Sequence, residues 1–279
     1  MRTHHTPVFL KEAVYALDIK KNEQYIDATY GEGGHAREIV RNGGLLLAID
    51  ADIEQVNKDA NTFKIVHGNF ADIQEIAKQE GCLSVSGILF DFGLSMRQVR
   101  EGGKGFSFEN LNDSLDMRLS DKGMSASDYL NNADHETLQH DLMKYSEDIH
   151  SKEIANKIIQ QRSVKAIETV QDLLHIVDTV VQRNMMTRRK TYARIFQALR
   201  IVINNEIENI KKALNGALNI TKTDGKIVVI TFHSIEDRVV KSFARSKSEY
   251  LIESIVDVGR NRQLAQFERS AVLRVLTII

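Results

Sequence analysis

Two acidic residues flank a cluster of glycines near the start of the chain. Asp27 ends a short apolar run four residues before Gly31, and Gly33 and Gly34 open a helix-like stretch. Asp50 ends the next apolar run, at about the spacing where an acid binds the hydroxyl groups of a ribose. Glycines at such a turn allow the backbone to approach a ligand closely. These residues predict a nucleoside-binding site.

The position of Asp27 argues against a dinucleotide as the ligand. A dinucleotide site holds the pyrophosphate at the helix N-terminus that follows the glycines, and a carboxylate on the preceding strand would repel it. The same carboxylate suits the ammonium group of an amino acid. S-adenosylmethionine joins a nucleoside to an amino acid without phosphates, so we favour it as the cofactor. The alternative interpretation is a structural glycine turn with two capping acids.

The elements that must position these residues alternate between two patterns. Short apolar runs lie at 24–30, 45–50, 63–70 and 86–93, and amphipathic stretches separate them. This alternation predicts βαβ units, with a parallel sheet covered by helices on both faces. Ligands bind such sheets beyond the carboxyl ends of the strands. Asp52 and Asp72 stand where helix N-caps are expected.

The alternation stops after Gly93. Residues 126–186 have helical periodicity throughout, and 196–218 reads as one long amphipathic helix. A strand over 226–234, a helix and a final strand follow. We therefore predict an α/β sheet domain with an inserted all-helical domain. The expected boundaries are 1–104 for the first part of the sheet domain, 105–190 for the insert and 191–279 for the second part.

Composition sets broad limits on function. The 279 residues are 42% hydrophobic and 27% charged, with a formal net charge of −1, so nucleic acid would have to be attracted by a local patch. Cys82 is the single cysteine, which excludes an internal disulfide and a zinc site of several thiolates. We predict no metal site. No signal peptide and no apolar run of about 20 residues is recognisable, which indicates a cytoplasmic protein without a membrane partner.

Several motifs give the chain a specific resemblance. They include "HTPVFLKEA", "DATYGEGGHA", "GILFDFGLSMRQ", "LDMR" and "FHSIEDR", in one order over nearly the whole sequence. In these motifs the chain resembles the MraW family, the bacterial ribosomal RNA small subunit methyltransferases H. The resemblance implies a class I, Rossmann-like methyltransferase sheet with a helical insert. It also implies methyl transfer from S-adenosylmethionine to N4 of a cytidine in the decoding region of 16S rRNA.

The resemblance carries cofactor contacts to positions of this chain. The implied contacts are Gly33, Gly34, His35, Asp50, Phe70, Asp91 and Gln98. Some of these residues also have a structural interpretation, since His35 could simply open a helix, Phe70 could belong to the core and Asp91 could cap backbone groups.

The expected reaction needs a proton acceptor. Cytosine N4 is a poor nucleophile because its lone pair is delocalised into the ring, and a carboxylate that accepts from N4–H could orient that lone pair and act as a base. Asp91 is the first candidate for this role. Asp116 and His233 are the next, together with Glu236 and Asp237 beside His233. The "FHSIEDR" turn could also be a helix N-cap formed by Ser234 and Asp237.

A basic cluster in the helical region predicts RNA binding. The stretch 179–205 contains no acidic residue, and we expect Arg188, Arg189, Lys190 and Arg194 to contact phosphates. Tyr192 and Phe196 could stack on bases, although we favour a core position for Phe196. The expected partner is 16S rRNA in the small ribosomal subunit. A homodimer is also compatible with the sequence, which does not determine the oligomeric state.

Two other functions stay open at this point. An NAD(P)-dependent oxidoreductase would also use a glycine turn, although no hydride-transfer site is recognisable. A non-catalytic RNA-binding assembly factor could retain the methyltransferase fold. Binding of S-adenosylhomocysteine rather than NADH, and methyl transfer from labelled cofactor, distinguish the three functions.

Overall fold

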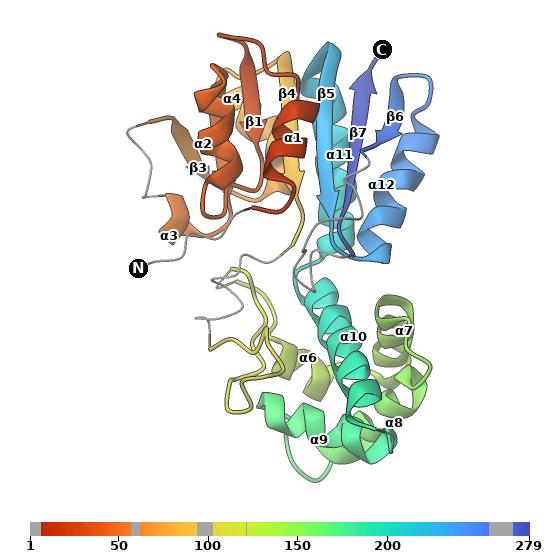
Figure 1. The fold of residues 1–279 in the computed structure, drawn as a ribbon. Helices are drawn as coiled ribbons and strands as arrows, with labels where there is room; N and C mark the ends of the chain where they lie inside the picture. Colours follow the sequence, from red (N-terminus) through yellow and green to blue (C-terminus); the bar gives the residue numbers. More distant parts are fainter. Residues whose placement is uncertain (1–6, 57–61, 94–102, 121, 183, 257–269) are drawn as a thin grey trace. The chain divides into compact units, whose positions relative to one another are not determined.

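The computed structural model describes residues 7–56, 62–93, 103–120, 122–182, 184–256 and 270–279. The chain divides into two compact units (Figure 1). Unit 1 comprises Met1–Gly93 and Ile207–Ile279, and unit 2 comprises Leu94–Glu206.

Unit 1 is built on a seven-stranded sheet with the order β3-β2-β1-β4-β5-β7-β6. The strands are β1 Gln24–Asp27, β2 Leu45–Asp50, β3 Lys64–His67, β4 Val85–Asp91, β5 Thr221–Thr231, β6 Leu251–Ile255 and β7 Val272–Ile278. Strands β1 to β5 run parallel, and β7 runs antiparallel to both of its neighbours. The predicted α/β sheet domain, with its final strand, is confirmed, whereas β6 was not predicted.

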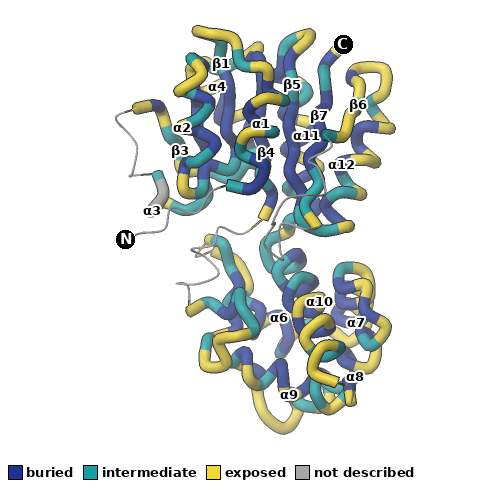
Figure 2. Tube along the Cα trace, viewed as in Figure 1, coloured by how far each residue is buried: buried dark blue, intermediate teal, exposed yellow. Residues whose placement is uncertain are grey.

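Helices cover both faces of this sheet. Figure 1 shows α1 Leu10–Ala16 and α2 Gly34–Arg41 in front of the sheet and α11 Glu206–Ile220 behind it. The remaining helices are α3 Ile53–Val56, η1 Phe70–Asp72, α4 Ile73–Gln79 and α12 Ser234–Ser246. Two separate apolar clusters result, one with α1 and α2 and one with α4, α11 and α12. The near-continuous apolar strands β1 and β4 are therefore buried on both sides (Figure 2).

The strand order reverses at β1. The chain moves from β1 outwards to β2 and β3, and then returns to β4 on the other side of β1. Open α/β sheets bind ligands at such a switch point, beyond the carboxyl ends of the strands. The carboxyl ends of β1, β2 and β4 are therefore the place to look for a site.

Unit 2 is helical. Its helices are α6 Ala126–Asn132, α7 His135–Ser146, α8 Ser151–Arg162, α9 Val170–Val180 and α10 Met185–Ile203. Capping boxes begin two of them, through Ser125 with Asp128 and Thr169 with Asp172. The predicted helical insert is present, but α10 belongs to it as one continuous helix. The compact units consequently divide at 93/94 and 206/207, rather than after residues 104 and 190.

The expected single helix over 196–218 is wrong, because the chain breaks between α10 and α11. Asn205 adopts a left-handed conformation with φ 50°, which most residues avoid but asparagine tolerates. The side chain of Asn204 accepts a hydrogen bond from the amide of Leu119 (2.8 Å) and donates to the carbonyl of Met117 (2.8 Å). These long-range bonds compete with continuation of the helix, and the local sequence pattern does not predict them.

Across the described ranges, no helix combines the length and the apolar character that a bilayer crossing needs.

Candidate functional site

Three acids stand at the carboxyl ends of β1, β2 and β4 on one face of the sheet. Asp27 lies in register with Leu89, so Asp91 follows on the same face, two residues further along β4. Asp27 in turn lies in register with Ala48, and Asp50 is two residues beyond it. This is the face that α1 and α2 cover, since Tyr25, Ala48 and Leu89 belong to their cluster. The sheet register therefore brings together carboxylates that are 23 to 64 positions apart in the sequence.

The glycine turn between β1 and α2 is held in a conformation that favours glycine. Gly31 and Gly33 have φ values of 54° and 75°. A Cβ atom on Gly33 would meet the Tyr30 ring at 2.6 Å, and one on Gly34 would meet Pro7 Cγ at 2.1 Å. Glycine is thus required at Gly33 by both backbone and contacts, and at Gly34 by the packing of Pro7.

Asp50 connects the second strand to this turn. Its Oδ2 accepts from the amide of Gly31 (2.6 Å), and its Oδ1 accepts from the amide of Asp52 (2.8 Å). Burial raises the pKa of Asp50, and the two amide bonds act in the opposite direction. Each carboxylate oxygen can accept a further hydrogen bond, so the side chain is able to hold vicinal hydroxyl groups.

Asp27 and Asp91 differ from Asp50 because each has an oxygen without a partner. Asp27 Oδ2 and Asp91 Oδ1 are buried and receive no hydrogen bond within the described part of the chain. Burial raises the pKa of Asp27 to about 7. Burial, followed by the charges of Asp27 and Glu236, raises the pKa of Asp91 well above its usual range. Buried polar groups are normally paired, so a ligand with cationic or hydrogen-bond-donating groups would suit these two oxygens.

Thr29 connects the Asp27 carboxylate to the backbone of Asp91. Its amide donates to Asp27 Oδ1 (3.2 Å), and its Oγ1 accepts from the amide of Asp91 (2.7 Å). Thr29 was not among the residues expected from the sequence, although its place two residues after the end of β1 is a usable signal.

His35 lies in the first turn of α2, beside Asp91. Its Nε2 donates to the carbonyl of Val8 (3.2 Å), which leaves Nδ1 directed towards Asp91 Oδ2 at 3.8 Å. Burial lowers the pKa of His35 to about 4, so the ring is neutral at pH 7. A neutral imidazole cannot compensate the charge of Asp91.

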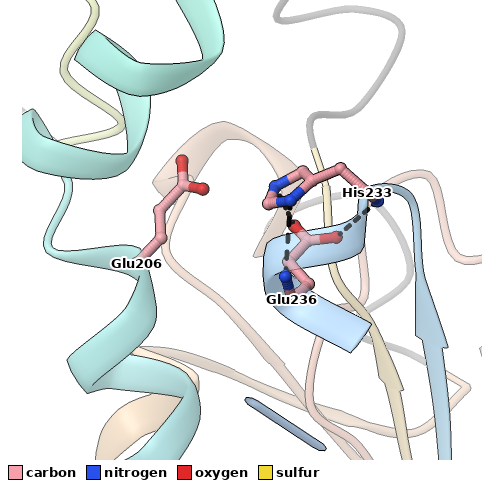
Figure 3. A group of neighbouring side chains, drawn as sticks. All are labelled: Glu206, His233 and Glu236. Atoms are coloured by element: carbon pink, nitrogen blue, oxygen red, sulfur yellow. Dashed lines mark hydrogen bonds and ion pairs between the residues drawn. The ribbon is translucent and has the colours of Figure 1, made fainter. Parts of the chain in front are cut away.

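His233 begins α12 and pairs with Glu236 (Figure 3). The ring Nδ1 accepts from the amide of Glu236 (3.3 Å), and Nε2 lies 3.1 Å from Glu236 Oε1. Oε2 of the buried Glu236 accepts from the amide of Phe232 (2.8 Å). The expected N-cap formed by Ser234 and Asp237 is therefore wrong by one residue. The cap is His233 with Glu236.

Asp237 has a different partner. It accepts two hydrogen bonds from the buried Arg274 of β7, at 2.6 and 2.8 Å, and Arg274 also binds Glu253 of β6. Asp237 thus ties α12 to the sheet. Arg274 was not selected from the sequence, where a charge inside an apolar strand is the available signal.

Phe70 and Gln98 complete the set of expected cofactor contacts. Phe70 begins η1, is partly buried and contacts Phe92 and Phe90 at centroid distances of 5.3 and 6.3 Å. Gln98 lies outside the described residues.

Asp116 belongs to unit 2. Both of its oxygens accept hydrogen bonds from Arg118, at 2.6 and 3.0 Å, and Arg118 lowers the pKa of Asp116. Met117 between them has a φ of 55° and a buried side chain. The left-handed turn lets the side chains of residues 116 and 118 meet.

The basic residues of α10 are less available than the sequence indicated. Arg189 pairs with Glu109 and lies 5.3 Å from the centre of the Phe108 ring, Arg188 pairs with Asp178 (3.6 Å), and Arg194 pairs with the buried Asp148 (3.3 Å). Lys190 is exposed.

The aromatic residues of α10 have structural positions. Tyr192 is buried, and its hydroxyl donates to Asp178. The idea that Tyr192 stacks on bases is therefore wrong. The core position favoured for Phe196 is confirmed.

Comparison with known proteins identifies the family. The model of the MraW methylase family matches residues 2–274. The chain belongs to this family. It is 37% identical to a ribosomal RNA small subunit methyltransferase H of Dictyoglomus thermophilum, over 97% of this chain and 95% of that protein. It is 40% identical to the protein of the same name from Buchnera aphidicola subsp. Baizongia pistaciae, over 86% of this chain and 78% of that one.

A solved rRNA methylase structure from Streptococcus thermophilus has a TM-score of 0.47 at 7% identity, over 100% of this chain and 99% of that one.

Membership in this family confirms the expected reaction class, methyl transfer from S-adenosylmethionine. The residues at the sheet edge fit that cofactor. Asp50 can hold ribose hydroxyls, and the unpartnered oxygens of Asp27 and Asp91 suit a ligand that carries ammonium and sulfonium charges.

Proposed function

We propose that this chain methylates N4 of a cytidine in the decoding region of 16S rRNA, with S-adenosylmethionine as methyl donor. The observation that carries the proposal is the pair of unpartnered carboxylate oxygens beside the glycine turn, in a chain of the MraW methylase family. A dinucleotide would bring phosphates to this acidic edge, so the oxidoreductase alternative is disfavoured.

S-adenosylmethionine supplies an electrophilic methyl group on a sulfonium. The protein must place cytosine N4 in line with that group, and such positioning can lower the barrier by several kcal/mol, about 7–11 in well-oriented systems. In its ionised form Asp91 can accept the N4–H hydrogen bond, direct the nitrogen lone pair and take up the proton. We therefore propose Asp91 as the catalytic residue.

Asp116 and His233 are weaker candidates for the proton acceptor. Arg118 occupies both oxygens of Asp116 and lowers its pKa, which reduces its basicity. Both ring nitrogens of His233 have partners in the α12 cap. We propose a positioning role for His233, which fixes the start of α12 next to the end of β5.

We propose the remaining cofactor contacts at Gly33, Gly34, His35, Asp50, Phe70 and Gln98. Unit 2 is proposed as the substrate-recognition domain, with phosphate contacts from Arg188, Arg189, Lys190 and Arg194. The proposed substrate context is 16S rRNA within the small ribosomal subunit, and the place of action is then the cytoplasm. A homodimer is the proposed assembly, and sedimentation equilibrium of the full chain tests it directly.

The decisive experiment is methyl transfer from labelled S-adenosylmethionine to isolated small ribosomal subunits. Mass spectrometry of the digested RNA should identify N4-methylated cytidine. A different modified nucleoside would disprove the proposed target atom. RNA binding without any transfer would favour the assembly-factor alternative, and binding of NADH in place of S-adenosylhomocysteine would favour the oxidoreductase.

A further inference from the structure

We propose that Asp27 and Asp91 form a carboxyl pair that holds one proton in the empty site and releases it when the cationic cofactor binds. Cofactor binding would then create the carboxylate that the reaction needs. The inference rests on the proposed function, because the ligand is taken to be S-adenosylmethionine.

The geometry that carries the inference is the arrangement of the two acids on neighbouring strands. Asp27 and Asp91 lie on the same face, two register positions apart. Thr29 donates from its amide to the Asp27 carboxylate and accepts at Oγ1 from the backbone amide of Asp91. Asp27 is 1% exposed, and the side chain of Asp91 is 22% exposed. Each of them has one buried oxygen without a hydrogen-bond partner in the described ranges.

Among the described residues whose charges or hydrogen bonds shift the pKa values of Asp27 and Asp91, none carries a positive charge. Asp27 faces the backbone amides of Thr29 and Ala36 and the charge of Asp50. Asp91 faces Asp27, Glu236 and the neutral ring of His35. Two ionised carboxylates in this environment would repel each other without compensation, and one shared proton removes that repulsion. The raised pKa values of both groups agree with this arrangement.

A cationic ligand changes the balance. When an ammonium group reaches the pair, the carboxyl O–H bond breaks, the proton passes to the buffer, and the new carboxylate accepts an N–H hydrogen bond. The sulfonium charge adds to the same effect. After methyl transfer the cofactor product has a neutral sulfur, so the pair faces one positive charge less. The pair is then protonated in a larger fraction of the molecules. The pair would therefore discriminate between the charged cofactor and its neutral-sulfur product.

Calorimetric titration of the full chain tests the inference. S-adenosylmethionine is titrated at pH 7 in buffers that differ in ionisation enthalpy, so that the slope reports protons released. We expect release of about one proton per bound cofactor, and a smaller release with S-adenosylhomocysteine. Asp27→Asn should reduce the release, because a pair with a single carboxyl loses its mutual repulsion. The matched control Asp224→Asn alters an exposed acid with φ 64° in β5, and it should release protons as the wild type does.

A second measurement needs no variant. Because binding releases a proton, the wild-type affinity for S-adenosylmethionine should rise as the pH is raised towards 7, by up to about tenfold per pH unit. The affinity for S-adenosylhomocysteine should rise less. Tight binding without proton release and without this pH dependence would overturn the inference and leave the proposed function intact. Absence of S-adenosylmethionine binding would instead overturn the proposed function.

Discussion

The two units differ in whether their buried carboxylate oxygens have hydrogen-bond partners. In unit 1, Asp27 and Asp91 keep buried oxygens without partners, whereas no such atom occurs in the described part of unit 2. In unit 2 the buried Asp148 is paired with Arg194, and Glu206 is paired with Arg200 at 2.7 Å. Asp27 and Asp91 of unit 1 can therefore accept hydrogen bonds from a ligand, whereas the buried Asp148 of unit 2 already has a partner within the chain.

This difference indicates two modes of binding. A cation that enters unit 1 gains contacts that the empty protein lacks, so binding relieves an unfavourable arrangement. A phosphate that approaches α10 must compete with Glu109 for Arg189 and with Asp178 for Arg188. Exposed ion pairs are weak, so this competition is moderate, and it makes unit 2 less attractive to arbitrary anions.

The strongest test of the site in unit 1 is Asp91→Asn. The amide retains the shape and one acceptor oxygen but loses the charge and the basicity. If Asp91 takes the proton from N4, single-turnover methyl transfer should be slower by about 10²–10⁴. Affinity for S-adenosylhomocysteine should change much less. Near-normal turnover would remove Asp91 from the mechanism, and parallel loss of binding and turnover would make it a cofactor ligand only.

The pH dependence of stability tests whether Asp27 is protonated in the empty protein. Its pKa is about 7 in the folded state and about 4 when unfolded, so the folded state binds more protons between these values. This group therefore contributes stability below pH 4 that is lost as the pH rises towards 7.

His35, with its lowered pKa of about 4, opposes this trend up to about pH 6.5. Asp27→Asn removes the Asp27 contribution and the part of the raised pKa of Asp91 that the charge of Asp27 causes, and both changes have the same sign. The free energy of unfolding of the variant, measured relative to wild type by urea denaturation, should thus increase with pH by up to about 1.4 kcal/mol per unit. A difference that is constant between pH 4 and 7 would show that Asp27 is ionised throughout.

Asp50→Ala tests the acid of the same site whose two oxygens each accept a backbone hydrogen bond. The variant loses an acceptor for the ribose hydroxyls, and charge-assisted bonds contribute roughly 1.5–3 kcal/mol each. Equilibrium dialysis with S-adenosylhomocysteine should show an affinity at least about tenfold lower. A circular dichroism spectrum like that of wild type would confirm that the sheet survives. Unchanged affinity would mean that the ribose lies elsewhere.

The smallest expected effect concerns the paired charges of unit 2. Glu109→Gln releases Arg189 from its partner, and RNA affinity should increase by up to about fivefold, the range of an exposed ion pair. Glu136→Gln removes an equal charge from the exposed surface of α7 and should have less effect. Filter binding at several salt concentrations compares the two variants. Equal effects would show that only net charge matters.

The sequence predicted the part of the site that depends on local order. Four apolar runs that end near Asp27, Asp50, the "GNF" turn and Asp91 became β1 to β4, because strand periodicity and glycine turns are short-range signals. The placement of acids at the carboxyl ends followed from that rhythm, since parallel strands present their ends at one edge. The family motifs then identified the reaction class.

Tertiary structure alone decided which charged groups find partners. The register between β1 and β4 placed Asp91 beside Thr29 and Asp27. Long-range contacts gave Arg189 and Arg194 their ion pairs with Glu109 and Asp148. The bonds of Asn204 to residues 117 and 119 broke a helix that its periodicity favoured. Burial and pairing depend on groups distant in the sequence, and they set the pKa values, so the protonation state of the site could not be predicted from residue types and spacing.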